Sequence, residues 1–284
     1  MGRCAERAAV LTTVLVFAGS ALATDLIHKE FHFKVRRHAS ISVLNEYGPI
    51  TVHPVAGHQV IVNAYLHSPK VEVNSSQRGS RVEFVSHLLP GANADSGTVD
   101  YDVLLPADAS VTLDACSGSI YAEGLRGDVT LVGNSGAVEV KNVSNGHVHI
   151  KTLDGPITLT NVSDGHVEVT SVGGQVTMTS VSGSRIDVNT NKGNIAYNGD
   201  FGGGGEYLFM TNTGNIDATA PAYASISVSA QSMKGQVVND FPLHPNDETY
   251  VVTMGSSFFG YLGKAASSVK LVSWSGKIHL KKHP

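Results

Sequence analysis

Apolar and polar residues alternate along residues 117–232 in a pattern that recurs six times, in lines of 18 to 21 residues. The second residue of each line is a glycine: Gly118, Gly136, Gly155, Gly174, Gly193 and Gly214. Two positions further on stands an aliphatic residue: Ile120, Val138, Ile157, Val176, Ile195 and Ile216. A second alternation follows within the line, as in Val148-x-Ile150. Because alternation at period two is typical of strands with one buried face, each line predicts two short strands.

A line of two short strands cannot bury its apolar face alone, whereas stacking the lines on one another buries all of them. Equivalent residues then pair in parallel, about 4.8 Å apart, and the apolar positions form continuous inner columns. The pattern therefore predicts an all-β, single-domain parallel β-solenoid, similar to a β-helix, with about 19 residues and two strands per coil. We expect right-handed winding, since parallel crossover connections are nearly always right-handed.

Weaker lines of the same kind precede these core repeats. Residues 45–66 contain the glycine-x-aliphatic pattern and then alternate at Val60 and Val62, so they are expected to form one more coil. Residues 81–89 and 98–115 alternate as well.

The two ends of a solenoid must be covered, because a terminal coil otherwise offers unpaired strands to other molecules. We expect FHFKVRRHASISVLNE (31–46) to cap one end. We expect FFGYLGKAASS (258–268), followed by the last strand around Ile278, to cap the other. Phe258, Phe259 and Tyr261 are the expected exposed aromatic residues, either within this cap or as a patch for a partner or a sugar.

The first 23 residues are expected to be a signal peptide. Arg3 and Arg7 flank the start of an apolar run that ends in Ala21-Leu22-Ala23, an A-x-A cleavage signature. We therefore expect an exported protein whose mature domain spans residues 24–284, without a membrane span after cleavage. The periplasm, the cell surface and the medium all remain open as destinations.

Composition narrows the function classes. The 284 residues carry a net charge of −4, so nothing suggests a nucleic-acid binder. Only 15% of the residues are charged and 30 are glycine, a mixture that favours strands and tight turns. Cys116 is the one cysteine of the mature domain, so an internal disulfide is impossible. We expect Cys116 to be a small, partly buried filler.

One outer column of the predicted stack contains residue types that bind metals. In the repeat register, His147 stacks on His166, and His149 stacks beside them on Glu168. Stacked rungs place such residues about 5 Å apart, within the dimensions of a metal site. However, solvent-facing positions accept any polar residue, and Arg185 in the next rung would repel a cation. We therefore expect no metal site and no cofactor, with these four residues as the only candidates.

Four segments together resemble a large bacterial envelope family labelled "putative adhesin", a domain of unknown function. The segments are HASISVLNEYGPITVHPVAGHQVIVNA, VDYDVLLPADASVTLDACSGSIYAEGL, the Ser-Gly-x-Ile lines from residue 117 onward, and LVSWSGKIHLKK. In order they cover nearly all of residues 38–282. The resemblance implies an exported β-solenoid without known catalysis. The glycine run FGGGG (201–205) departs from the family pattern and is expected to be a widened turn.

Two further function classes compete with an adhesin. Carbohydrate-active enzymes on β-helices, lyases or hydrolases, need acidic clusters or paired carboxylates, whereas the outer faces here are mainly Thr, Ser and Asn. The second competing class is an envelope-stress sensor that binds a membrane regulator. We expect an exported, non-enzymatic adhesin or scaffold with no catalytic residues, which binds a glycan or an envelope protein through its Thr/Ser/Asn ladders. The sequence leaves the oligomeric state open.

Overall fold

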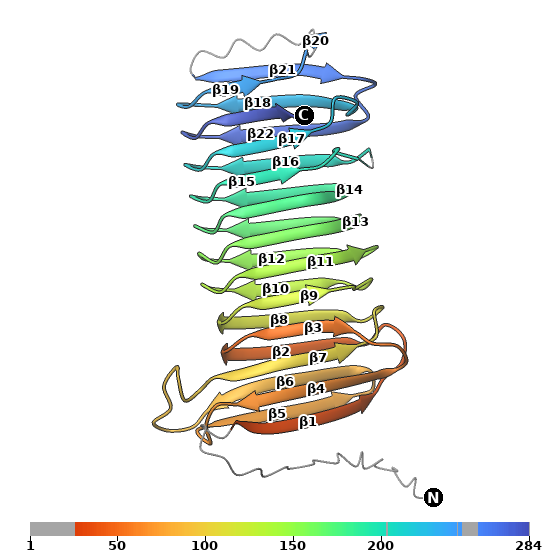
Figure 1. Cartoon of the computed structure of the whole chain (residues 1–284), viewed down its shortest axis with the longest axis vertical. Helices are drawn as coiled ribbons and strands as arrows, with labels where there is room; N and C mark the ends of the chain where they lie inside the picture. Colours follow the sequence, from red (N-terminus) through yellow and green to blue (C-terminus); the bar gives the residue numbers. More distant parts are fainter. Residues whose placement is uncertain (1–25, 203, 243, 246–254, 284) are drawn as a thin grey trace, which may run out of the picture.

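The chain folds into a tall, flattened coil of β-strands (Figure 1). The computed structural model describes residues 26–202, 204–242, 244–245 and 255–283. Every regular element in these ranges is a strand, which confirms the all-β prediction, and they include no helix long and apolar enough to cross a membrane. The expected signal peptide, residues 1–23, lies outside the described residues.

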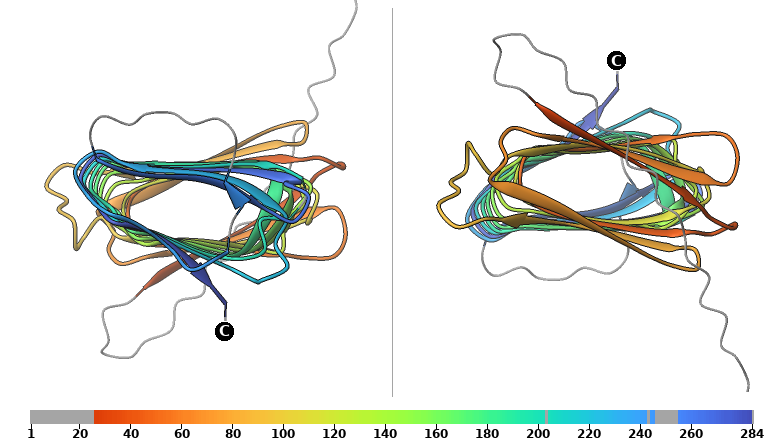
Figure 2. Two further views of the ribbon diagram at one scale, coloured as in Figure 1. Left: turned by 90° about the horizontal axis from the view of Figure 1, so that it is seen from above. Right: turned by 90° about the horizontal axis from the view of Figure 1, so that it is seen from below.

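The centre of the coil is a stack of parallel strands. These are β8 (Ser110–Ser117), β9 (Ile120–Glu123), β10 (Val129–Gly133), β11 (Val138–Ser144), β12 (His147–Thr152), β13 (Ile157–Ser171), β14 (Val176–Thr190), β15 (Ile195–Asn198), β16 (Glu206–Thr211) and β17 (Ile216–Ala220). Val129 pairs with Val148, and Val148 pairs with Val167, so each step up this part of the stack is 19 residues of chain. Seen along the stack, the strands form two facing sides of a flattened ring (Figure 2).

The predicted inner columns are buried between these two sides. Every aliphatic residue two positions after a column glycine is at most 1% exposed: Ile120, Val138, Ile157, Val176, Ile195 and Ile216. The second column, Val129, Val148, Val167 and Ile186, is equally buried. Every coil therefore gains about 25 cal/mol of stabilisation for each Å² of apolar surface that it buries. The buried columns run through the stack as a single continuous core.

The outer sides of the stack form two faces, which we name by their side chains. The threonine face is the outer side of β9, β11, the first halves of β13 and β14, β15 and β17. The histidine face is the outer side of β8, β10, β12, the second halves of β13 and β14, and β16. β13 and β14 each turn from one face to the other within a single 15-residue strand.

The N-terminal coils stack out of sequence order. They contain β1 (Ile27–Lys34), β2 (Ser40–Tyr47), β3 (Ile50–Pro54), β4 (Gln59–Leu66), β5 (Val71–Arg78), β6 (Arg81–Leu88) and β7 (Val99–Leu105). β2 pairs with both β6 and β8, and β3 pairs with both β7 and β9. The coil β2–β3 is therefore inserted between two coils that follow it in sequence.

The C-terminal coils are arranged in the same way. They contain β18 (Ile226–Ser232), β19 (Val237–Asn239), β20 (His244–Pro245), β21 (Ser256–Leu262), β22 (Ser267–Ser273) and β23 (Ile278–Lys282). β22 lies between β16 and β18, and β23 lies between β17 and β19. The last coil of the chain thus sits inside the stack, as the position of the C-terminus in Figure 1 shows.

This order corrects three expectations from the sequence. The segment 31–46 was expected to cap the stack, but only its first residues, which belong to β1, lie at the end of the stack. The strand Ser40–Tyr47 is internal. The last strand, expected in the cap, is internal as well, and β21 covers β18 as an antiparallel strand. Residues 45–66 do not form one coil, because β4 pairs antiparallel with β1 and β7. Alternation fixes which face a side chain takes, but it contains no information on strand direction.

A ladder of buried hydroxyl groups supports the corner where the histidine face ends. Its members are Thr152, Ser171, Thr190, Thr211, Ser273 and Ser232, each at most 6% exposed. From Ser171 onward, each hydroxyl oxygen accepts the backbone N–H of the glycine three residues later, at 2.8–3.0 Å. Since a buried N–H without a partner is costly, this bond stabilises each turn.

Candidate functional site

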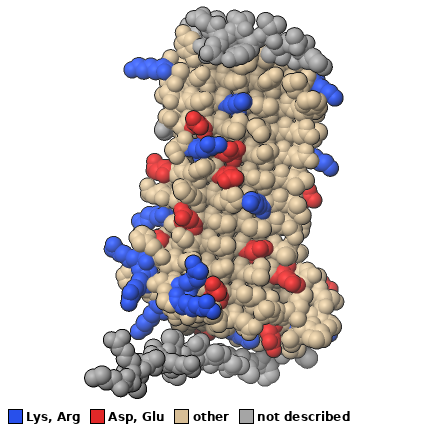
Figure 3. All heavy atoms as spheres, turned by 180° about the vertical axis from the view of Figure 1, so that it is seen from behind, with Lys and Arg blue, Asp and Glu red and all other residues tan. Residues whose placement is uncertain are grey.

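The threonine face carries a regular array of uncharged side chains at its centre. Thr158 on β13 pairs with Thr177 on β14, and Thr160 pairs with Thr179. All four are partly exposed, so each offers a hydroxyl and a methyl group to solvent. Neighbouring rungs lie about 4.8 Å apart, which makes the array flat and periodic. Figure 3 shows one face of the molecule, where Lys and Arg gather near the N-terminal end and single charged residues of both signs are scattered along the rest of the stack.

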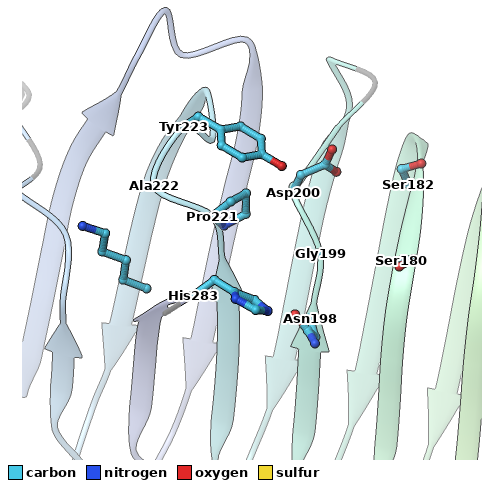
Figure 4. Close-up of a pocket in the computed structure, with 10 residues that line it drawn as sticks. Ser180, Ser182, Asn198, Gly199, Asp200, Pro221, Ala222, Tyr223 and His283 are labelled. Carbon is cyan, nitrogen blue, oxygen red and sulfur yellow. The ribbon is translucent and has the colours of Figure 1, made fainter.

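A cavity of about 870 Å³ opens at the corner where these strands end. It is lined by Ser180, Ser182, Asn198, Gly199, Asp200, Pro221, Ala222, Tyr223, Lys282 and His283. Asn198 pairs with Thr179, so the cavity continues the threonine face without a break. Figure 4 shows Tyr223 and Asp200 at the same opening, with Ser182 and Asn198 on neighbouring strands. The cavity therefore presents hydroxyl, amide and carboxylate groups around an aromatic ring.

Tyr223 is the most exposed large hydrophobic residue of the described chain, at 82%. It lies in the turn between β17 and β18, where the Ala224 N–H donates to the Pro221 carbonyl at 3.1 Å. The proline and this bond hold the turn, and with it the backbone of Tyr223, at the cavity rim. Tyrosine combines an apolar ring with a polar hydroxyl group, which is why it is enriched at contact surfaces.

The opposite wall of the cavity is fixed by an aromatic cluster inside the solenoid. Tyr197 stacks on Phe201 with ring centroids 4.3 Å apart, and the Phe201 N–H donates to the Tyr197 hydroxyl at 3.0 Å. The Tyr207 hydroxyl donates to the Gly202 carbonyl at 2.7 Å. Burial raises the pKa of Tyr207 to about 12, so it stays a neutral donor. The described residues of the run, 201–202 and 204–205, belong to the connection between β15 and β16, where a widened turn was expected.

The lining of this cavity contains few acidic groups. Asp200 is the single carboxylate among the described residues that line it, and its Oδ1 accepts the Gly202 N–H at 2.9 Å. Glycoside hydrolysis in its common form uses two carboxyl groups on either side of the bond to be cleaved. The residues around Tyr223 do not supply that pair.

A charged cluster occupies the N-terminal end of the threonine face, on β9 and β11 and the neighbouring β3. Glu123 accepts from the Tyr121 hydroxyl at 2.6 Å and contacts His53 Nδ1 at 2.7 Å. The bond from Tyr121, followed by that from His53, lowers the pKa of Glu123, so this carboxylate stays ionised. Lys141 pairs with Glu139 at 2.6 Å. These groups satisfy one another and delimit the uncharged array.

The histidine face brings together the four metal candidates in the predicted register. His147 pairs with His166, with ring centroids 5.6 Å apart and edge to face. His149 Nδ1 lies 3.2 Å from Glu168 Oε2. The four side chains thus form two separate pairs, and within the described ranges no three His, Cys, Asp or Glu side chains are grouped to hold a metal ion.

Cys116 differs from the expectation. It is exposed rather than partly buried, because it lies at the corner, one residue beyond the buried Ala115. Partial desolvation, together with Asp114 and Glu46, raises the pKa of its thiol. A raised pKa keeps the thiol protonated, which disfavours nucleophilic chemistry.

The aromatic residues chosen from the sequence are not the most exposed ones. Phe258 packs against the core and Tyr261 is 36% exposed, whereas Tyr223 is 82% and Trp274 is 49% exposed. Sequence reasoning missed Tyr223 and Trp274. Their signal was available in the sequence, because Tyr223 stands two residues after Pro221 and Trp274 stands two residues before the column glycine Gly276. Both therefore fall in turns, where the alternation offers no inner position.

Known proteins provide a family for this chain. No curated protein matches it. A solved structure described as a putative adhesin from Parabacteroides distasonis is 13% identical, with a TM-score of 0.45, over 90% of this chain and 98% of that chain. One described as a putative cell adhesion protein from Clostridium sporogenes is 11% identical, with a TM-score of 0.24, over 90% and 100%. The family model Toastrack DUF4097 matches residues 57–281, or 225 of the 284 residues. The chain therefore belongs to the Toastrack DUF4097 family.

Proposed function

We propose that this protein is a non-enzymatic, adhesin-like protein of the cell envelope that holds a glycan along the threonine face and the corner cavity. The exposed ring of Tyr223, in a cavity that is also lined by hydroxyl and amide groups, is the observation that carries the proposal. A sugar ring has an apolar C–H side and a rim of hydroxyl groups. It therefore matches a cavity that offers an aromatic ring together with the polar groups of Ser180, Ser182 and Asn198.

The array of threonines extends the same contact surface. Thr158, Thr160, Thr177 and Thr179 offer hydroxyl groups at a constant spacing, which suits a ligand that repeats as a polysaccharide does. The methyl groups of these residues add apolar contact without charge. Stacked rungs are rigid, so binding orders few protein side chains and costs little entropy.

Substitution of Tyr223 tests the proposal. The purified protein should bind a subset of a glycan array, and Tyr223→Ala should weaken that binding by about ten-fold or more, since the ring is the main apolar contact. Tyr223→Phe keeps the ring and should retain most of the affinity. Because this side chain is 82% exposed, neither variant should change the melting temperature.

Two results would argue against a glycan ligand. If the protein bound no glycan on the array, a protein partner would be favoured, and a pull-down from the native envelope would capture it. Cleavage of a bound glycan, detected by a change in its mass, would favour a carbohydrate-active enzyme.

We further infer that the protein is exported with removal of residues 1–23. The inference rests on Arg3 and Arg7, the apolar run and the Ala21-Leu22-Ala23 signature. Mass spectrometry of the protein from its native envelope should give Thr24 as the first residue. Protein that retains residues 1–23 and stays in the membrane fraction would show instead that the apolar run serves as an anchor.

A further inference from the structure

A second cavity, of about 380 Å³, lies at the opposite corner of the solenoid, where the strands of the histidine face end. One rim consists of Asn189, Met210 and Val272, which are outward residues of β14, β16 and β22. The other rim consists of Asn191, Asn212, Trp274 and Met233 at the corner. Between them lie Thr190, Thr211 and Ser273 of the hydroxyl ladder, which forms the floor. We call this feature the Trp274 groove.

Trp274 is in this groove because of the inserted last coil. Its backbone N–H donates to the Thr211 carbonyl at 3.3 Å, and its backbone carbonyl accepts the Lys234 N–H at 2.8 Å. The backbone of Trp274 therefore lies between two coils that precede it in sequence. It is the only tryptophan of the chain, and it is 49% exposed within a cavity. Half-exposed tryptophan at a cavity rim is typical of a binding site.

Two side-chain amides stand next to the indole in the stack. Asn212 Nδ2 donates to Asn191 Oδ1 at 3.2 Å, so the two amides form one exposed row. The bond leaves the Asn191 NH₂ group and the Asn212 carbonyl with capacity for a ligand. Rungs about 4.8 Å apart place these groups at a spacing comparable to one sugar unit.

The charge around the groove is positive, although the chain as a whole carries −4. Lys234 Nζ lies 5.5 Å from the centre of the Trp274 ring. Lys192 directly follows Asn191, and Lys270 is the outward residue before Val272 on β22; both are exposed. Asp187, the outward residue before Asn189, is paired with Arg185 at 3.2 Å. No described residue that lines the groove is a carboxylate.

We propose that the Trp274 groove binds an acidic glycan that carries carboxylate groups, such as a chain of uronic acids. A sugar ring stacks on the indole, its hydroxyl groups bond to Asn191 and Asn212, and its carboxylate pairs with Lys234. The inference extends the proposed glycan-binding role, but it concerns a separate surface, because the groove and the Tyr223 cavity share no lining residue.

Fluorescence of the single tryptophan tests this inference directly. The protein is titrated with oligogalacturonide, oligomannuronate and hyaluronan oligosaccharides, and with methyl-esterified oligogalacturonide as the neutral probe. At least one acidic probe should shift the Trp274 emission to shorter wavelength in a saturable way, and the neutral ester should bind at least about ten-fold more weakly.

Matched lysine variants locate the contact. Lys234→Gln should weaken the binding of the acidic probe by about five- to ten-fold, since a charge-assisted bond is lost. Lys34→Gln removes the same charge from an exposed site at the other end of the stack and should leave the titration unchanged. Asn212→Ala should weaken the binding of both the acidic and the neutral probes.

Several results would overturn the assignment: no emission shift with any acidic probe, equal binding of the neutral ester, or equal effects of the two lysine variants. A shift produced by apolar peptides and not by sugars would identify the groove as a peptide site instead. Tyr223→Ala separates the two proposals, because it should weaken array binding at the cavity by about ten-fold or more and leave the Trp274 titration intact. Loss of both signals in Tyr223→Ala would contradict two separate sites.

Discussion

Replacing Gly155 by alanine should destabilise the protein by about 3 kcal/mol or more, and lower its melting temperature by roughly 6–12 °C. A Cβ atom at Gly155 would overlap the backbone carbonyl oxygen of Gly136 in the coil below. The obstacle is backbone rather than the end of a flexible side chain, so relief requires the two coils to separate. Separation would weaken the ladder bonds and the apolar contacts on both sides of the corner.

The same close approach recurs along the whole column. Each glycine would meet the carbonyl oxygen of the preceding one in the stack: Gly118, Gly136, Gly155, Gly174, Gly193, Gly214, Gly276 and Gly235. Gly276 lies between Gly214 and Gly235 in the stack, although it follows both in the sequence. The glycine column thus explains why this residue type recurs, and it supports the insertion of the last coil.

Gly79→Ala is the matched control. Gly79 has a φ of +66° in the turn before β6, and an added Cβ would meet nothing within 4 Å. Its replacement should cost only about 1–2 kcal/mol, from the left-handed backbone conformation. Thermal unfolding measures the melting temperatures of both variants, and the shift should be larger for Gly155→Ala. Equal shifts for Gly79→Ala and Gly155→Ala would contradict a column held by close backbone packing.

Replacing Asn45 by alanine should cost about 3 kcal/mol, because it leaves several buried polar groups without partners. Asn45 is fully buried, and its Nδ2 donates to the carbonyls of Gly48 at 3.0 Å and Val99 at 2.8 Å. Its Oδ1 accepts from the Ser86 hydroxyl at 2.9 Å. Ser86 also bonds to the Tyr101 hydroxyl at 2.9 Å, and burial raises the pKa of Tyr101 to about 12.

This network connects the inserted coil β2–β3 to the coil of β6 and β7. Asn45 occupies the column position that Ala115 fills in the next coil, so its role is specific to the insertion. The double variant Asn45→Ala/Ser86→Ala should cost less than the sum of its single variants, since both remove the same bond.

Asn63→Ala is the control for a partly exposed asparagine. Its side chain makes one bond, with His28 Nε2 at 3.0 Å, and its loss should cost under about 1 kcal/mol. Urea unfolding compares the variants. If Asn45→Ala and Asn63→Ala destabilised the protein equally, the buried network would not be what fixes the inserted coil.

The regular part of the fold could be predicted from the sequence because each repeat constrains its neighbours. The Asn-Val-Ser segments at 142–144 and 161–163, which are one repeat apart, illustrate this. Asn142 and Asn161 take the left-handed conformation with φ of 54° and 55°, as turn residues do, and the Asn161 amide donates to the Asn142 oxygen at 3.1 Å. Val143 and Val162 fill the corner at 1% exposure. Equal side chains in register therefore serve equal structural purposes.

The stacking order could not be predicted in the same way. The line that contains Gly276 has the same pattern as the line that contains Gly214, so the pattern permits either order. The choice depends on tertiary contacts such as the bond from the Ser273 hydroxyl to the Gly214 carbonyl at 3.1 Å. The corner cavity was hidden for the same reason, because His283 reaches it only through the inserted coil.

Hydrogen–deuterium exchange with and without the glycan selected on the array measures most directly where this protein binds its ligand. We expect slower exchange in the corner turns 199–202 and 221–224, no change at the paired histidines 147 and 166, and recovery of the glycan with unchanged mass. Protection confined to the histidine face or to the N-terminal coils, or recovery of a cleaved glycan, would contradict a non-enzymatic binding site at Tyr223.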